Sequence, residues 1–179
     1  QMGYTLTIGE AVIDYSDDLV RIDAEGVRHD EAPAHGEPTD YTNSRWPSYS
    51  SWADAMRTLD LMDVIFNQRN GGSGSFDRDG TTYYPLMPSH PGESPVTQAH
   101  VAEVAERLEA YKAKHPDHIA QYPPLKPDAK PLAEGTKFYG DEQYVDDPKY
   151  DDALVRGEWL LYWLKWAVEN CERPVFVNR

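Results

Sequence analysis

Tryptophan recurs with the period of an α-helix towards the end of the chain, and this feature constrains the fold more than any other. Trp159, Trp163 and Trp166 stand at the spacing i, i+4, i+7, which places them on one helical face. A helix that is apolar on nearly all sides lies at the centre of its domain. An exposed platform that stacks sugars or bases is the alternative, but a stripe in helical register needs no ligand to explain it. Apolar side chains fill most other positions of this segment, namely Val155, Leu160, Leu161, Tyr162, Leu164, Ala167 and Val168.

The first thirty residues alternate between apolar and polar side chains, which is typical of β-strands. Tyr4, Leu6 and Ile8 form one apolar series, and Gly9 then predicts a bend or bulge. We expect two or three antiparallel strands over residues 3–29, with one apolar face and one acidic face. Two further apolar series follow on either side of a polar turn, formed by Ala11, Ile13 and Tyr15 and by Val20, Ile22 and Ala24.

Helices and a last strand are predicted in the remainder of the chain. Ser50 or Ser51 caps a helix that ends near Asn67–Asn70, and Thr97 caps the next. The last strand must pair with the N-terminal sheet to be stable. Strands first, helices afterwards and a returning strand predict an α+β fold, a small antiparallel sheet packed on three helices in a single domain over residues 2–179. The second helix is expected over about residues 98–114 and the last strand over residues 174–178. The tryptophan helix is expected to start at Asp151 or Asp152 and to run to about Asn170.

Two long segments rich in proline and glycine separate these elements, and we read both mainly as loops. In residues 70–95, Asp79-Gly80 predicts a type I′ hairpin turn. Residues 70–75 have no apolar side chain, and ordering them costs about 1–2 kcal/mol of backbone entropy per residue. We therefore expect residues 70–75 to be the most mobile internal stretch unless a ligand or partner holds them. Residues 116–148 are expected to form an ordered wrap or a mobile loop, and three aromatic side chains are expected to pin it: Phe138, Tyr139 and Tyr144.

Negative charge is concentrated near the N-terminus. Ten acids and only two bases lie between Glu10 and Asp40, which accounts for eight of the fourteen surplus negative charges of the chain. Such a field repels nucleic acid and anionic membranes and attracts basic partners or cations. The wet face of the predicted sheet carries Asp14, Asp23 and Glu25. We therefore expect no direct binding of nucleic acid and no membrane association.

These charges suggest a non-enzymatic acidic protein that binds a basic protein surface. Its strongest version is a nucleic-acid mimic, in which carboxylates stand in place of phosphates. The competing explanation is that the charge confers only solubility.

A second hypothesis centres on the loop over residues 30–49, which concentrates acid, base, cation and aromatic groups. In this hypothesis the protein is a small-ligand-binding protein or a hydrolase, and its pocket is formed by this loop and closed by the 70–95 segment. In the simpler interpretation these side chains only cap turns and anchor the loop. We assign no catalytic residue, because the sequence has no nucleophile motif and no phosphate-binding glycine loop. The candidate residues are His35, Glu37, Asp40, Tyr41, Asn43, Arg45 and Trp46.

Metal and cofactor sites are not predicted. His115 and His118 have the spacing of a zinc-binding pair, but Pro116 breaks the helix that would hold them, so a solvated helix end is favoured. Cys171 is the single cysteine, which excludes an intrachain disulfide and suggests a reducing, cytoplasmic setting. The sequence shows no run of apolar residues long enough to cross a membrane and no signal-peptide pattern.

The stretch from Ile8 through Trp52 and the ending WLLYWLKWAVENCERPVFVN resemble small uncharacterised proteins of phage and bacterial genomes. This resemblance implies a phage-type accessory or counter-defence role. It implies no activity and no site residues.

Overall fold

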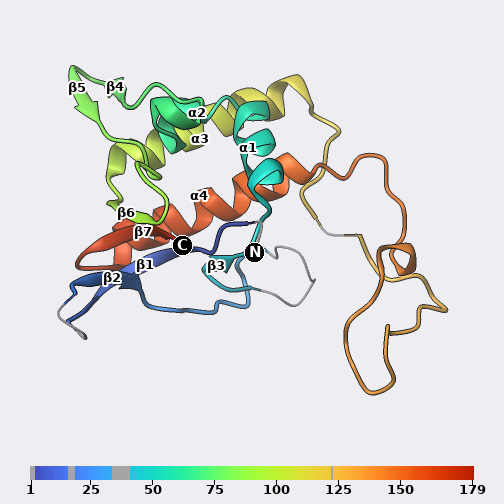
Figure 1. The fold of residues 1–179 in the computed structure, drawn as a ribbon. Coiled ribbons are helices and arrows are strands. Elements are labelled where there is room, and N and C mark those ends of the chain that lie inside the picture. Colours follow the sequence, from blue (N-terminus) through green and yellow to red (C-terminus); the bar gives the residue numbers. More distant parts are fainter. Residues whose placement is uncertain (1–2, 16–18, 34–40, 122) are drawn as a thin grey trace.

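The computed structural model describes residues 3–15, 19–33, 41–121 and 123–179. It confirms the predicted α+β fold, with a small antiparallel sheet packed on helices (Figure 1). The strand order is β2-β1-β7-β6, and a short strand, β3, also pairs with β1. The bounds of these strands are β1 (Leu6–Asp14), β2 (Arg21–Ala24), β3 (Ser44–Arg45), β6 (Gly92–Pro95) and β7 (Pro174–Asn178).

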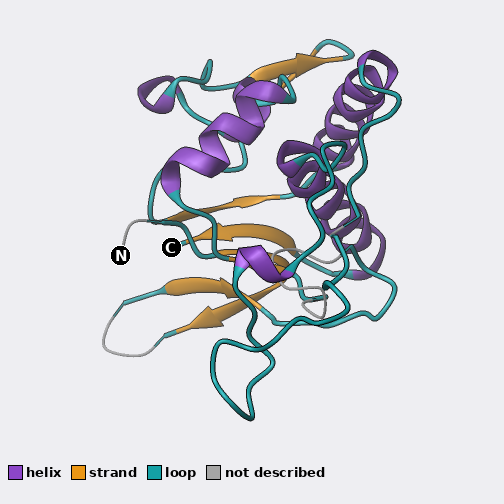
Figure 2. Ribbon diagram, turned by 90° about the vertical axis from the view of Figure 1, so that its right-hand side faces the viewer, coloured by secondary structure: helices purple, strands orange, loops and turns teal. Residues whose placement is uncertain are grey.

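Helix α4 (Asp152–Asn170) is the predicted tryptophan helix, and it lies between the sheet and the other helices (Figures 1 and 2). Trp159 and Trp163 have no exposed surface, and Trp166 is partly buried against the core. The indole of Trp159 meets that of Trp52 edge to face, with ring centroids 6.4 Å apart. The stripe is therefore core, as predicted, and β7 follows it at the predicted residues and pairs with β1.

The predicted helix after residue 50 is divided into α1 (Tyr49–Thr58), α2 (Met62–Ile65) and the short 3₁₀ helix η2 (Gln68–Asn70). Ser48, rather than Ser50 or Ser51, is the N-cap. Asp60 adopts a left-handed conformation, with φ 60°, and stops α1. The N–H groups of Asp60 and Leu61 then donate to the carbonyls of Arg57 and Met56, which is the Schellman pattern of helix termination.

Two predictions about the sheet are wrong. There is no bulge at Gly9, because the register of β1 with β7 is unbroken from Leu6 to Glu10. A Cβ atom at Gly9 would come within 3.0 Å of the Asn43 amide and of the Glu25 carbonyl. The glycine is needed for this close approach and not for a bulge. The predicted 70–95 loop contains β6, because the backbone of Gly92–Pro95 pairs with β7.

The Asp79-Gly80 turn is confirmed between β4 (Phe76–Arg78) and β5 (Thr81–Tyr83). Both turn residues have positive φ, 51° and 79°, as a type I′ turn requires. This hairpin forms a separate two-stranded sheet and lies on the helical side of the molecule (Figure 1).

Helix α3 (Gln98–Lys114) begins and ends as predicted. The side chains of Thr97 and His100 cap its first turn reciprocally, which is a capping box with histidine in the third position. His100 is buried, and its Nε2 atom lies 2.8 Å from the carbonyl oxygen of Tyr84.

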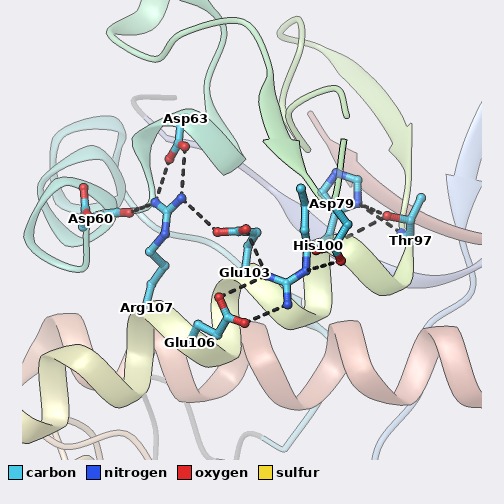
Figure 3. A network of polar contacts seen from close by, with 9 residues as sticks. Asp60, Asp63, Asp79, Thr97, His100, Glu103, Glu106 and Arg107 are labelled. Atoms are coloured by element: carbon cyan, nitrogen blue, oxygen red, sulfur yellow. Dashed lines mark hydrogen bonds and ion pairs between the residues drawn. The ribbon is translucent and has the colours of Figure 1, made fainter. Parts of the chain in front are cut away.

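Two arginines join the neighbouring elements to α3 through Glu103, whose side chain is largely buried (Figure 3). Arg107 donates to Asp63 of α2 and to Glu103. Arg78 of β4 donates to Glu103 at 3.0 Å and to Glu106 at 2.7 Å. The network fixes α2 and the β4–β5 hairpin to the same helix.

The proline-rich segment before α4 loops away from the body, with one short 3₁₀ helix, η3 (Asp141–Gln143) (Figure 1). Tyr144 is buried and stacks edge-on with Tyr139. Phe138 is exposed, so the prediction that it pins the segment is wrong. The tyrosines pack within the segment itself.

Candidate functional site

The three acids predicted for the wet face of the sheet lie on or beside β1 and β2. In the antiparallel register, Val12 is opposite Asp23 and Asp14 is opposite Arg21, and directly opposed residues share one face of a sheet. Asp14 and Asp23 therefore share a face, and Glu25 lies exposed one residue beyond β2. The register also places an arginine and a valine on this face, so it is not a row of carboxylates.

Large apolar side chains are exposed beside these acids. The exposed fractions are 46, 71, 73 and 67% for Val12, Tyr15, Leu19 and Val20. All four lie at the end of β1 or in the segment that leads to β2. Exposed apolar area with a polar rim is typical of protein interaction sites. We define the β1–β2 surface as these four residues and two acids: Val12, Asp14, Tyr15, Leu19, Val20 and Asp23.

A groove of about 500 Å³ borders the β1–β2 surface and is lined in part by Leu19, Val20 and Pro91. Its charged lining is mixed. Arg179 forms ion pairs with Asp23 and with Glu93, each at 3.5 Å, and Arg21 is 3.1 Å from Asp23. The groove thus combines apolar walls with carboxylates that arginines partly neutralise.

Glu10, another acid of the charged N-terminal segment, has a structural role. Its carboxylate accepts hydrogen bonds from the backbone N–H groups of Arg173 and Glu172, at 2.6 and 2.9 Å. These two hydrogen bonds lower the pKa of Glu10. The carboxylate therefore holds the turn between α4 and β7 against β1.

In the loop over residues 30–49, Asn43 is a structural residue. Its side chain is fully buried, accepts a hydrogen bond from the N–H of Val27 at 2.8 Å, and donates to the carbonyls of Ile8 and Glu25 at 2.8 and 2.7 Å. Every hydrogen-bonding position but one on this carboxamide is used to join the loop to β1 and to the end of β2.

The other described candidates of this loop differ in burial. Tyr41 is partly buried and carries the guanidinium of Arg28 over its ring, 5.6 Å from the centroid. Arg45 is buried in β3, and Trp46 is 59% exposed. Three other candidates lie outside the described residues: His35, Glu37 and Asp40.

A histidine–carboxylate pair that sequence analysis missed joins the end of α3 to the start of α4. The buried Asp151 caps α4 through the N–H of Leu154, and its other oxygen accepts from Nδ1 of His118 at 2.7 Å and from the Tyr111 hydroxyl. Burial alone would raise the pKa of Asp151, but the hydrogen bonds from Tyr111, His118 and Leu154 outweigh it and lower the pKa.

The His118 ring also stacks on His115, with centroids 4.6 Å apart. The prediction of a merely solvated helix end is therefore wrong for His118, because Asp151 binds it from 33 residues away. No local pattern relates these two positions.

No family model, no curated protein and no solved structure matches this chain. Across the described ranges, no three His, Cys, Asp or Glu side chains gather closely enough to hold a metal ion. Within the same ranges, no helix is both long enough and apolar enough to cross a bilayer. Function is therefore inferred from surface geometry and chemistry.

Proposed function

We propose that this protein is a non-enzymatic binding protein that uses the β1–β2 surface to hold a partner protein with an apolar and basic surface. The observation that carries this proposal is the exposure of four large apolar side chains next to Asp14 and Asp23. Covering apolar area gains roughly 25 cal/mol per Å², so such side chains supply affinity once a partner excludes water from them.

The charge of the N-terminal segment supports a basic partner. Its excess of eight negative charges between Glu10 and Asp40 attracts positive surfaces over about one Debye length, roughly 10 Å at 0.1 M salt. Charges at the rim of an interface mainly speed association and fix orientation. In this proposal the acids guide the partner and the apolar side chains hold it.

A protein interface fits this surface better than strict nucleic-acid mimicry does. Arg21 and Arg179 lie among the carboxylates, and a phosphate mimic would be weakened by cations in the same row. Four apolar side chains would also have no counterpart in a phosphate backbone. The partner is therefore expected to offer apolar side chains between its lysines or arginines.

The test compares three forms of the immobilised protein: wild type, Leu19→Ser/Val20→Ser, and Leu132→Ser. Leu132 is as exposed as Leu19 and Val20 but lies in the proline-rich segment, so it is a matched control. A protein captured from a lysate of the native host by wild type is purified and titrated against each form at low and high salt. We expect the double variant to lose binding, the control to keep it, and salt to weaken it.

Two results would contradict the proposal. Equal affinity of the wild type and the double variant would show that the partner binds elsewhere. A wild-type dimer in sedimentation that the double variant abolishes would show that the apolar side chains form a contact between copies of this chain.

A further inference from the structure

A pocket of about 920 Å³, lined by none of the residues of the β1–β2 surface, lies beside the glycine-rich segment. One wall is formed by residues 67–75 and the other by residues 82–90. Tyr84 of the second wall is tied to α3, because its carbonyl oxygen lies 2.8 Å from Nε2 of the buried His100. Arg78 fixes the adjoining β4–β5 hairpin to the same helix (Figure 3).

The glycine-rich wall has a defined course that only glycine permits. A Cβ atom on Gly72 would lie 1.9 Å from the carbonyl oxygen of Phe66, and Gly71 has a φ of 94°. Asn67 closes the turn by accepting from the N–H of Asn70 at 3.0 Å, and its amide donates to the carbonyl of Pro88 in the opposite wall. Residues 70–75 have the composition of a flexible linker, but their glycines form a closely packed turn.

His90 lies at the end of the second wall, and its ring is held from both sides. Its Nδ1 atom is 2.7 Å from Oδ1 of the buried Asn178, and its Nε2 atom is 3.3 Å from the Tyr49 hydroxyl. The imidazole is therefore a fixed part of the pocket.

Four side chains that line the pocket have hydrogen-bonding groups to spare. In the part of the chain that the structure describes, no hydrogen bond or ion pair occupies the side chains of Gln68, Arg69, Asn70 and Tyr84. They supply two carboxamides, one guanidinium and one phenol. Asn67 and His90 already form hydrogen bonds within the protein, whereas the side chains of these four residues remain available for a ligand.

The charge of the pocket differs from that of the chain. The chain has 31 acids against 17 lysines and arginines, yet no described carboxylate lines this pocket, and Arg69 is its one formally charged group. An arginine without a paired carboxylate is suited to phosphate, which it binds through parallel N–H donors. Carboxamides can donate to and accept from neighbouring hydroxyl groups.

We propose that this pocket binds a small, hydroxyl-rich organic phosphate of the sugar-phosphate class. Arg69 binds the phosphate, Gln68 and Asn70 bind the hydroxyl groups, and the exposed ring of Tyr84 covers the apolar face of the sugar. The site is independent of the protein-binding surface, and either proposal can fail without the other.

The test uses ribose 5-phosphate, ribose and inorganic phosphate as probes of the full chain, followed by amide chemical shifts in NMR titrations. We expect ribose 5-phosphate to bind most tightly and to shift amides of residues 67–75 and 82–90. Arg69→Gln should weaken it by about tenfold. Arg57→Gln, which removes an exposed arginine of α1 outside the pocket, should leave the affinity unchanged.

Equal weakening by both variants would overturn the proposal, since it would indicate non-specific attraction to positive charge. Shifts confined to other residues, or binding of phosphate as tight as that of ribose 5-phosphate, would overturn it as well. An absence of shifts with all three probes at millimolar concentration would have the same consequence.

Discussion

Asn178 determines which nitrogen of His90 carries the proton. The amide nitrogen of Asn178 donates to the carbonyls of Ser89 and Gly92, at 3.0 and 3.2 Å. Its oxygen is therefore the atom that faces His90, and it can only accept the hydrogen bond from Nδ1 at 2.7 Å. The neutral ring then presents the lone pair of Nε2 to the hydroxyl of Tyr49.

This relationship predicts that neutral His90 is the Nδ1–H tautomer. Nitrogen-15 chemical shifts of the ring, measured in long-range proton–nitrogen spectra at alkaline pH, should show a protonated Nδ1. Asn178→Asp should keep this tautomer, because a carboxylate is also an acceptor. A protonated Nε2 in wild type would contradict the orientation of the Asn178 amide.

Asn43 is predicted to act in stability and not in ligand binding. Asn43→Ala leaves the N–H of Val27 and the carbonyls of Ile8 and Glu25 without their partner, and should lower the free energy of unfolding by about 2–4 kcal/mol. Asn170→Ala, at the exposed end of α4, should change it by about 0.5 kcal/mol or less. Urea unfolding measures both, and equal stability of the two variants would contradict the structural role.

Gly72 is predicted to tolerate no side chain. Gly72→Ala forces its Cβ atom against the backbone of Phe66 and should cost about 3 kcal/mol of unfolding free energy. Gly26, which has open space around its Cβ position, gives a control, and Gly26→Ala should stay within about 0.5 kcal/mol of wild type.

Hydrogen exchange tests the same turn independently. The N–H of Gly72 donates to the Asn67 carbonyl at 2.8 Å, so this amide should be protected. Exchange at the rate of an unstructured peptide would instead support the sequence-based expectation that residues 70–75 are mobile.

Acid should destabilise the protein partly through Asp151. Because the pKa of this carboxyl is lowered in the folded state, its ionised form contributes stability above the ordinary value of 3.8, and this contribution is lost as pH falls through the lower, folded-state pKa. Asp151→Asn should be less stable at neutral pH and should lose less stability on acidification. Parallel curves for wild type and Asp151→Asn would contradict this assignment.

Cys171 is predicted to react slowly. Burial, together with the nearby carboxylates of Glu10 and Glu25, raises the pKa of its thiol to about 11. Alkylation by iodoacetamide near pH 8 should be about tenfold slower, or more, than that of a cysteine in a short peptide. Glu25→Gln should increase the rate, whereas Glu142→Gln, in the proline-rich segment, should not. A peptide-like rate in wild type would contradict the raised pKa.

Sequence periodicity alone predicts the elements whose signals are local. The tryptophan stripe of α4, the Thr97 cap of α3 and the Asp79-Gly80 turn each depend on residues within one or two turns of the chain. Side-chain spacing and backbone geometry operate over that range, so these elements are found where they are predicted. The α+β class follows from their order.

Tertiary structure decides what depends on distant segments. Strand β6 has no alternation of its own and exists because β7 offers it a partner. Asp151 reaches His118, and Asn43 is buried rather than available to a ligand, because packing brings together backbone and side chains that no short pattern relates. The glycines at 71 and 72 have the composition of a linker, and only the fold shows that Gly71 has a positive φ and that the carbonyls of Met62 and Phe66 lie against Gly72. Composition shows which polar and charged groups a chain carries. Which of them are free to bind a ligand is decided by the fold, because folding pairs the others in hydrogen bonds and ion pairs.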